Sequence, residues 1–161
     1  MDFEERLKKA VDRGRKRGEQ AHQQQAAAQL SEEEFKRLHS TLRLALSDYI
    51  ETCLQKIPQH FPGFNFETVY GDRGWGAACS RDDLKLERGR RTNLYSRIEL
   101  TIRPYSPKLH VVELCGKATV HNREVFNRQF YQELPDVDEG EFRRRIDAWV
   151  LEFAELYAAA S

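Results

Sequence analysis

The clearest pattern in the chain is an apolar residue at every third or fourth position over residues 35–57, with charged and polar residues between. This spacing places the apolar side chains on one face of an α-helix. Pro58 has no backbone amide donor and disfavours helical geometry at Ile57, so we expect the helix to end there. The sequence therefore predicts an amphipathic helix with one buried face.

The start of this helix has a signal of its own. Ser31 can accept a hydrogen bond as the helix cap, and Glu34, three residues later, can reach back to the Ser31 amide. Leu30 and Phe35 have the spacing of a hydrophobic staple. We therefore predict that the helix begins at Ser31, and that a single folded domain spans residues 30–161.

Residues 1–29 differ in composition from the rest of the chain. No large apolar residue follows Val11 within this segment, which continues into a run rich in Gln and Ala. Gly14 and Gly18 each disfavour a helix by about 1 kcal/mol relative to Ala. We expect a charged, solvent-exposed arm that is partly helical or flexible.

Beyond residue 60 the period of the apolar positions falls from about four to two, which is the period of a β-strand. Prolines and glycines separate the segments and favour turns between them. The predicted strands are 64–70, 75–80 with an irregular continuation to 86, 94–102, 112–120 and 125–132.

The register between the third and fourth predicted strands follows from a turn centred on Ser106. In this register Leu100 lies opposite Val112, and the apolar faces of both strands agree. On the last strand, Phe130 would cover the gap left by Gly116. The five strands then form an antiparallel meander with one apolar face.

A second helix begins with the same chemistry as the first. Asp138 is the expected cap, Glu141 is the third helical residue, and the apolar residues over 142–157 mark one face. Two helices with one apolar stripe each, and a sheet with one apolar face, bury most area as a two-layer sandwich. We predict an α+β fold with both helices on one sheet face.

The length, charge and cysteine content of the chain narrow the kinds of protein it can be. Its 161 residues fit one domain with an arm, and its 26 basic residues balance its 26 acidic ones, so no overall field attracts nucleic acid or membranes. No window approaches the roughly 18 apolar residues of a membrane span. Three widely spaced cysteines without a C-x-x-C pair favour a reducing compartment. We expect a soluble, cytoplasmic protein.

Motifs for chemistry are sparse. The glycines over 71–76 lie between two predicted strands, which favours a hairpin turn over a phosphate-binding loop. The histidines and cysteines lack the spacing of metal ligands, and no nucleophile motif is present. The sequence therefore predicts no metal and no cofactor, and it leaves enzymatic activity uncertain.

The outer face of the predicted sheet holds the only weak catalytic candidates. In the register above, Glu99 lies opposite Glu113, with Arg97 and Lys117 beside them. Opposed carboxylates are unfavourable unless they share a proton, as some acid–base sites do. The commoner alternative is a solvated ladder of ion pairs, and a shift of two residues would pair Arg97 with Glu113.

Three less polar residues on the same face, Tyr95, Val111 and Cys115, are candidates for binding a partner. Apolar surface among charges suits a protein that supplies complementary charges, or a second copy of the chain pairing through an edge strand.

Two clusters of basic residues offer a different partner. Arg with Gly in an unstructured segment favours binding to phosphate backbones, although neither cluster has aromatic residues interleaved. The clusters are Arg13, Arg15, Lys16 and Arg17 in the arm, and Arg88, Arg90 and Arg91 in a predicted loop at 87–91.

Three hypotheses about function follow, in decreasing order of support. The first is a binding or adaptor module that engages a protein partner, or itself, through the sheet face or the arm. The second is a nucleic-acid- or ribosome-associated protein that uses the basic clusters. The third is an enzyme or small-ligand binder centred on Glu99 and Glu113.

Overall fold

The computed structural model describes residues 2–161, and of residues 27–30 it describes the backbone alone. The chain divides into two compact units, the first up to Arg37 and the second from Leu38 to Ser161. Helix α1 (Phe3–Leu54) contributes residues to both units.

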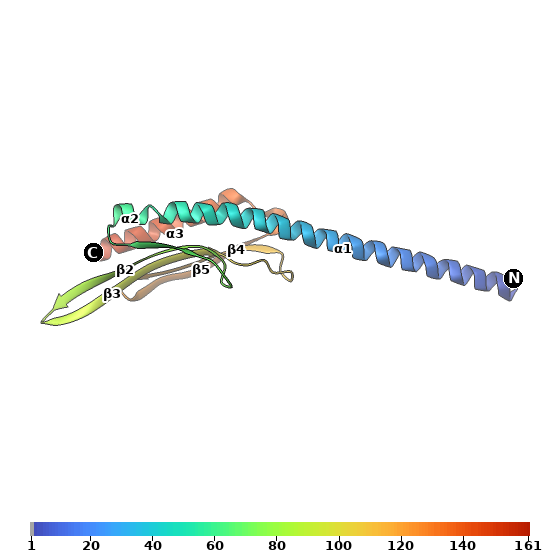
Figure 1. The fold of residues 1–161 in the computed structure, drawn as a ribbon, viewed down its shortest axis with the longest axis horizontal. Helices are drawn as coiled ribbons and strands as arrows, with labels where there is room; N and C mark the ends of the chain where they lie inside the picture. Colours follow the sequence, from blue (N-terminus) through green and yellow to red (C-terminus); the bar gives the residue numbers. More distant parts are fainter. Residues whose placement is uncertain (1) are drawn as a thin grey trace. The chain divides into compact units, whose positions relative to one another are not determined.

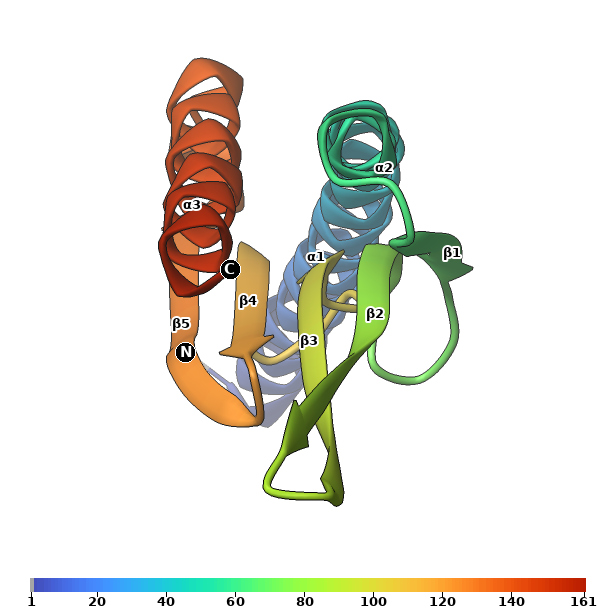
Figure 2. The same ribbon diagram turned by 90° about the vertical axis from the view of Figure 1, so that its left-hand side faces the viewer.

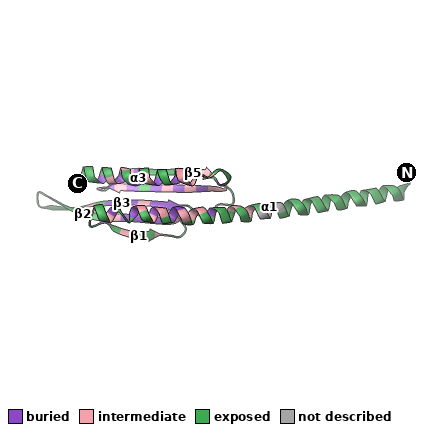
Figure 3. Ribbon diagram, turned by 90° about the horizontal axis from the view of Figure 1, so that it is seen from above, coloured by how far each residue is buried: buried purple, intermediate pink, exposed green. Residues whose placement is uncertain are grey.

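The first unit is helical from Phe3 onward, and all of its side chains from Asp2 to Ala26 are exposed (Figure 3). Exposure includes its large apolar side chains, with Phe3 75%, Leu7 51% and Val11 44% accessible. The first unit therefore presents an exposed apolar stripe.

The predicted helix start at Ser31 is wrong, because Ser31 lies inside α1 rather than at its beginning. A capping box satisfies amide groups only where the chain enters a helix, and the Ala and Gln residues before it are compatible with continued helix. Ser31 and Glu34 are both exposed within the helix. The predicted staple involves Leu30, whose side chain lies outside the described residues.

The second unit is a five-stranded antiparallel sheet in the order β1-β2-β3-β4-β5, which confirms the predicted meander and α+β class. Its helices pack on one face of this sheet (Figure 2). The elements after α1 are α2 (Ile57–His60), β1 (Asn65–Val69), β2 (Trp75–Glu87), β3 (Arg90–Ile102), β4 (Val111–Val120), β5 (Arg123–Glu133), a 3-10 helix (Leu134–Asp136) and α3 (Glu139–Ala160).

The predicted end of the first helix at Ile57 is also wrong, since α1 ends at Leu54 and Ile57 begins α2. Pro58 lies in the first turn of α2, where a missing amide donor costs nothing because that amide has no partner in a helix. Next to this break, the thiol of Cys79 donates to the carbonyl of Leu54 at 3.1 Å, which joins α1 to β2.

The predicted register between β3 and β4 is displaced by four residues. Leu100 lies opposite Gly116, not Val112, and Ile102 lies opposite Leu114. The connecting segment forms its own turn, in which the amide of His110 donates to the carbonyl of Ser106 at 3.2 Å. A shift by an even number leaves each side chain on its predicted face, so the core face is correct although the partners are not.

Trp149 of α3, rather than Phe130, fills the space above Gly116. A Cβ added at Gly116 would lie 2.5 Å from Cε3 of the Trp149 ring. Phe130 instead lies opposite Leu114 and packs edge-on against Phe142, with 4.9 Å between ring centroids. The prediction for Phe130 is therefore wrong, because β5 pairs with β4 so that Arg128, not Phe130, lies opposite Gly116.

The cap predicted for α3 is confirmed. The Asp138 carboxylate accepts a hydrogen bond from the amide of Glu141 at 3.3 Å. Behind it, α3 buries Phe142, Ile146, Trp149, Val150, Phe153 and Tyr157. These side chains lie at helical spacing, and they form the part of the core that α3 supplies.

His39 is a buried histidine in the second unit. It is 2% exposed, and its Nε2 atom has no hydrogen-bond partner among the described residues. Burial lowers the pKa of His39 below its ordinary value of 6.5, and the nearby Arg43 cation lowers it further. A hydrogen bond with the Arg103 backbone raises this pKa, but it is outweighed. The Tyr105 ring packs edge-on against it at 5.5 Å.

We expect the protein to lose stability as the pH falls below about 6.5, because unfolded His39 binds a proton more readily than folded His39. In His39→Gln, whose amide does not titrate, this loss should be smaller. Urea unfolding midpoints from about pH 8 to about pH 5 measure the difference. His22→Gln, on the exposed helix of the first unit, should behave as the native chain. Equal pH slopes for all three proteins would contradict this account of His39.

Candidate functional site

The sheet face opposite the helices carries a ladder of ion pairs centred on β3. The Arg97 guanidinium donates to Glu67 of β1 at 2.7 Å and to Glu99 of its own strand at 3.1 Å. Antiparallel pairing brings Lys117 of β4 opposite Glu99. This arrangement is the ion-pair ladder that the sequence offered as the alternative to a carboxylate pair.

The predicted pairing of Glu99 with Glu113 is wrong. With the register displaced by four, Glu113 lies opposite Tyr131 of β5, and its carboxylate is 3.9 Å from Nε of Arg103. Each carboxylate has its own cation, and the two are not cross-strand neighbours. They therefore cannot share a proton in the way that a dyad requires.

A cavity of about 290 Å³ opens on this face above β3 and β4. Tyr95, Arg97 and Glu99 of β3, with Lys117 and Thr119 of β4, form most of its lining. Two further elements complete it, since Arg73 from the β1–β2 turn and Glu124 of β5 also line it. The β1–β2 turn, predicted from its glycines, is thus part of the site.

The cavity has an excess of positive charge. Three cationic side chains line it against two carboxylates. Arg97 has carboxylate partners, whereas Arg73 and Lys117 have no ion-pair partner within the described residues. Arg73 and Lys117 form no ion pair within the described residues, so they can bind an anionic group at this depression, where Glu124 is the remaining carboxylate of the lining.

Of the three predicted partner-binding residues, only Tyr95 lines the cavity. It is 37% exposed. Val111 and Cys115 are half-buried on β4, opposite Glu133 and Gln129 of β5. Burial and the neighbouring Glu113 raise the pKa of the Cys115 thiol, so it is not an activated nucleophile.

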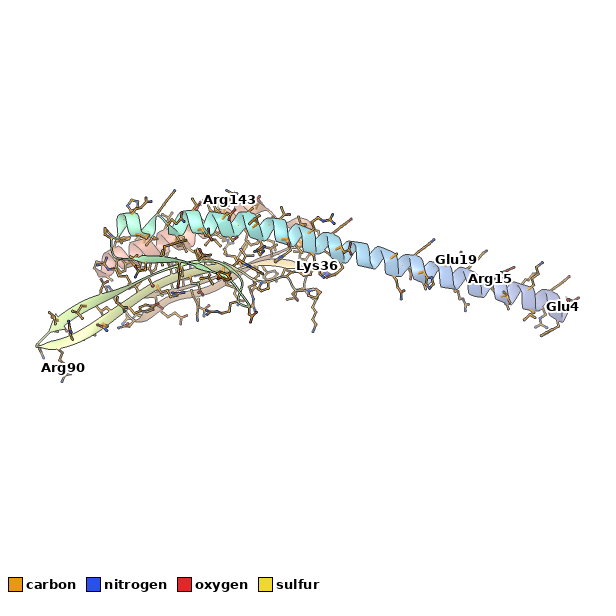
Figure 4. All side chains as sticks on the ribbon, in the orientation of Figure 1. Glu4, Arg15, Glu19, Lys36, Arg90 and Arg143 are labelled. Carbon is orange, nitrogen blue, oxygen red and sulfur yellow. The ribbon has the colours of Figure 1, made fainter. Side chains whose placement is uncertain are left out.

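The two basic clusters lie in different units. Arg13, Arg15, Lys16 and Arg17 are exposed on the helix of the first unit (Figure 4). The second cluster lies at the tip of the β2–β3 hairpin, which reaches beyond the other strands (Figure 1).

The predicted loop at 87–91 is a tight two-residue turn instead. Arg88 and Gly89 both have positive φ, at 51° and 76°, which is the backbone of a two-residue hairpin. Glu87 ends β2 and Arg90 begins β3. The strands therefore continue to the tip, and the basic residues are held on a hairpin rather than on an irregular loop.

A second polar cluster joins α3 to the sheet and was not predicted. The Tyr157 hydroxyl donates to the Asp83 carboxylate at 2.6 Å. The same carboxylate lies 2.7 Å from Nε of Arg81. His121 of the β4–β5 turn lies 3.5 Å from the same carboxylate. These residues border an open cavity of about 550 Å³.

The protonation states of this cluster indicate a structural role. Burial raises the pKa of Tyr157 to about 12, together with its hydrogen bond to Asp83. Burial of Asp83 opposes its ionisation, but the bonds from Tyr157 and Arg81 outweigh it and lower the pKa of Asp83. Tyr157 keeps its proton and Asp83 its charge at neutral pH. The two groups are hydrogen-bonded to each other within the fold, as in a structural contact between α3 and β2.

The remaining cysteines also lack the lowered pKa of an activated thiol. Burial raises the pKa of Cys53, and burial raises that of Cys79 to about 12. In the part of the chain that the structure describes, no three His, Cys, Asp or Glu side chains converge as metal ligands do. Nor does any helix of the described residues combine the length and apolar character that a membrane crossing requires.

Comparison of the chain with protein-family models, with curated proteins and with solved structures gave no match in any of the three. The geometry of the sheet face is therefore the basis for inferring function.

Proposed function

We propose that the protein is a binding module whose outer sheet face holds an acidic segment of a partner protein. The observation that carries this proposal is the pair of cations, Arg73 and Lys117, which line one cavity without a carboxylate of their own. A partner carboxylate between them would complete two charge-assisted hydrogen bonds, which are stronger than neutral ones.

The surroundings of the cavity favour a protein over a small ion. Tyr95 offers aromatic surface beside the charges, and aromatic residues supply much of the contact area in protein interfaces. Arg97 and Glu99 neutralise each other through their hydrogen bond. This pair therefore forms the base of the cavity and leaves Arg73 and Lys117 to bind the ligand. The combination suits a segment with acidic and apolar residues in alternation.

Nucleic acid and catalysis have less support. The side chains that line the cavity have a net charge of one positive unit, whereas phosphate backbones are bound by many cations. A catalytic pair is disfavoured because Glu99 and Glu113 face separate cations. Binding of an acidic peptide is the activity that uses the two cations without ion-pair partners, Arg73 and Lys117.

Removal of both cations, in Arg73→Gln with Lys117→Gln, is expected to weaken peptide binding at least tenfold, or about 1.4 kcal/mol. The probe is a fluorescent peptide of alternating Glu and Leu, and anisotropy at low salt measures its binding. Affinity should fall as salt rises, because the cavity is partly exposed.

The matched control removes two exposed basic residues elsewhere, in Lys108→Gln with Arg90→Gln, and should bind as the native protein does. A peptide with Gln in place of Glu should not bind. Equal affinity of the native and cavity variants, or of the Glu and Gln peptides, would refute the proposed function.

A further inference from the structure

The strands β2 and β3 continue together beyond the rest of the sheet. β1 pairs with β2 no further than Ser80, and β4 pairs with β3 no further than Arg97. The pairing of β2 with β3 nevertheless continues until Glu87 lies opposite Arg90. Residues 81–96 therefore form a two-stranded ribbon, which no further strand of residues 2–161 joins and which reaches beyond the other strands (Figure 1).

The base of the ribbon is supported by side chains from two other elements. Asn122 of the β4–β5 turn accepts a hydrogen bond from the amide of Tyr95 at 2.9 Å and donates one to the carbonyl of Asn93 at 2.8 Å. On the other strand, Tyr157 of α3 holds Asp83 through its hydroxyl. An isolated two-stranded hairpin is only marginally stable in water, so these contacts with the folded core support the ribbon.

The ribbon tip, residues 84–93, is exposed throughout and basic. It contains four basic side chains and one acidic side chain, a net charge of three positive units. The acidic residue, Glu87, is already paired with Lys85 at 3.1 Å. The arginines have no ion-pair partner among the residues that the structure describes: Arg88, Arg90 and Arg91.

The other carboxylates of the ribbon lie at its base. Asp83 is 2.7 Å from Nε of Arg81 and is held there. Asp82 precedes Leu86, which lies opposite Arg91, by four residues, or about 13 Å along the strand. This separation exceeds the screening length of about 10 Å at 0.1 M salt, so Asp82 does not offset the charge of the tip.

The arginines of the tip lie on both faces of the ribbon. Arg90 and Arg91 are consecutive strand residues, so their side chains project from opposite faces, and Arg88 lies in the turn between the strands. A protein surface that covers one face would contact only part of this set. A groove with anionic walls on both sides would contact all of it, and two phosphate backbones form such walls in a nucleic-acid duplex.

We propose that the ribbon enters the major groove of duplex DNA with its tip first, so that Arg90 and Arg91 contact phosphates of opposite strands (Figure 4 labels Arg90). The major groove of B-form DNA is about 12 Å wide and admits a two-stranded β-ribbon. The planar guanidinium group suits phosphate because it donates two parallel hydrogen bonds.

This site goes beyond the proposed function and is separate from the cavity. None of the residues that line the cavity belongs to the ribbon tip. The cavity has a net charge of one positive unit, which disfavours a phosphate backbone there, whereas the tip has three.

The test removes the three arginines of the tip together, in Arg88→Gln with Arg90→Gln and Arg91→Gln. Anisotropy of a fluorescent DNA duplex, measured at several salt concentrations around 0.1 M, reports binding. We expect the variant to bind about tenfold more weakly or worse. The slope of log affinity against log salt should be smaller by about 2–3, because each lost phosphate contact lowers it by about one. Thermal unfolding should be unchanged, since all three positions are exposed.

The matched control removes the same charge from the exposed helix of the first unit, in Arg13→Gln with Arg15→Gln and Arg17→Gln, and should bind DNA nearly as the native chain does. Lys at the three ribbon positions keeps the charge and should keep the salt dependence. A single strand of DNA, which has no groove, and an RNA duplex, whose major groove is narrow, should both bind less tightly than the DNA duplex.

A native chain that does not bind duplex DNA at low salt would overturn the proposal. Equal affinity of the native chain and the ribbon variant would do the same, as would a loss of binding only in the helix variant. Binding of the single strand or the RNA duplex as tightly as the DNA duplex would remove insertion into the groove. Acidic-peptide binding at the cavity should be unchanged in the ribbon variant, so the two proposals fail independently.

Discussion

Replacement of Phe153 by Ala is expected to lower the free energy of unfolding by about 3–5 kcal/mol. Phe153 is fully buried on α3, where its ring packs edge-on against Phe64 at 6.0 Å and stacks against Tyr157 at 6.3 Å. Truncation removes these contacts and leaves a cavity between α3 and the first part of the sheet. Tyr157 cannot move into that space without breaking its hydrogen bond to Asp83.

Chemical denaturation of the variant and the native chain measures this loss directly. Leu151→Ala, two residues earlier on the same helix, is the matched control because its side chain is 67% exposed. Its effect should stay below about 0.5 kcal/mol. Similar losses at both positions would mean that α3 does not bury the face described above.

The elements with strong local signals were predictable. The cap at Asp138 and the apolar stripe behind it define α3, because both act within a few residues of the chain. The period of two defined the strands and the face of each side chain. Arg97, Glu99 and Lys117 therefore lie on the predicted face of the sheet, and Tyr95 lines the cavity beside them.

The features that could not be predicted depend on contacts between residues far apart in the sequence. The β3–β4 connection is long enough to form a turn of its own, so its prolines did not set the register and Glu99 lies opposite Lys117. The capping box at Ser31 is a local pattern that also fits inside a helix. The contributions of Arg73 to the cavity and of Tyr157 to the Asp83 cluster come from segments that only the fold brings together.

Gly116→Ala is expected to destabilise the protein by about 1–3 kcal/mol, as overpacking of a well-filled core does. The added Cβ would lie 2.5 Å from Cε3 and 2.8 Å from Cζ3 of the Trp149 ring. Trp149 is 5% exposed and packs against Phe126, so it has little room to withdraw. Gly14→Ala, where an added Cβ meets no atom within 4 Å, should instead leave stability unchanged or raise it.

A double-mutant cycle identifies the side chain that fills the space above Gly116. Trp149→Leu removes the ring that the new methyl group would meet, so in that background Gly116→Ala should cost less, with a coupling of about 0.5–3 kcal/mol. Phe130→Leu should show no such coupling, because Phe130 packs over Leu114 and Phe142. The prediction that Phe130 covers Gly116 requires the opposite result, in which Phe130 is coupled to Gly116 and Trp149 is not. Unfolding measurements on these variants therefore test the pairing of β4 with β5 and the docking of α3 together.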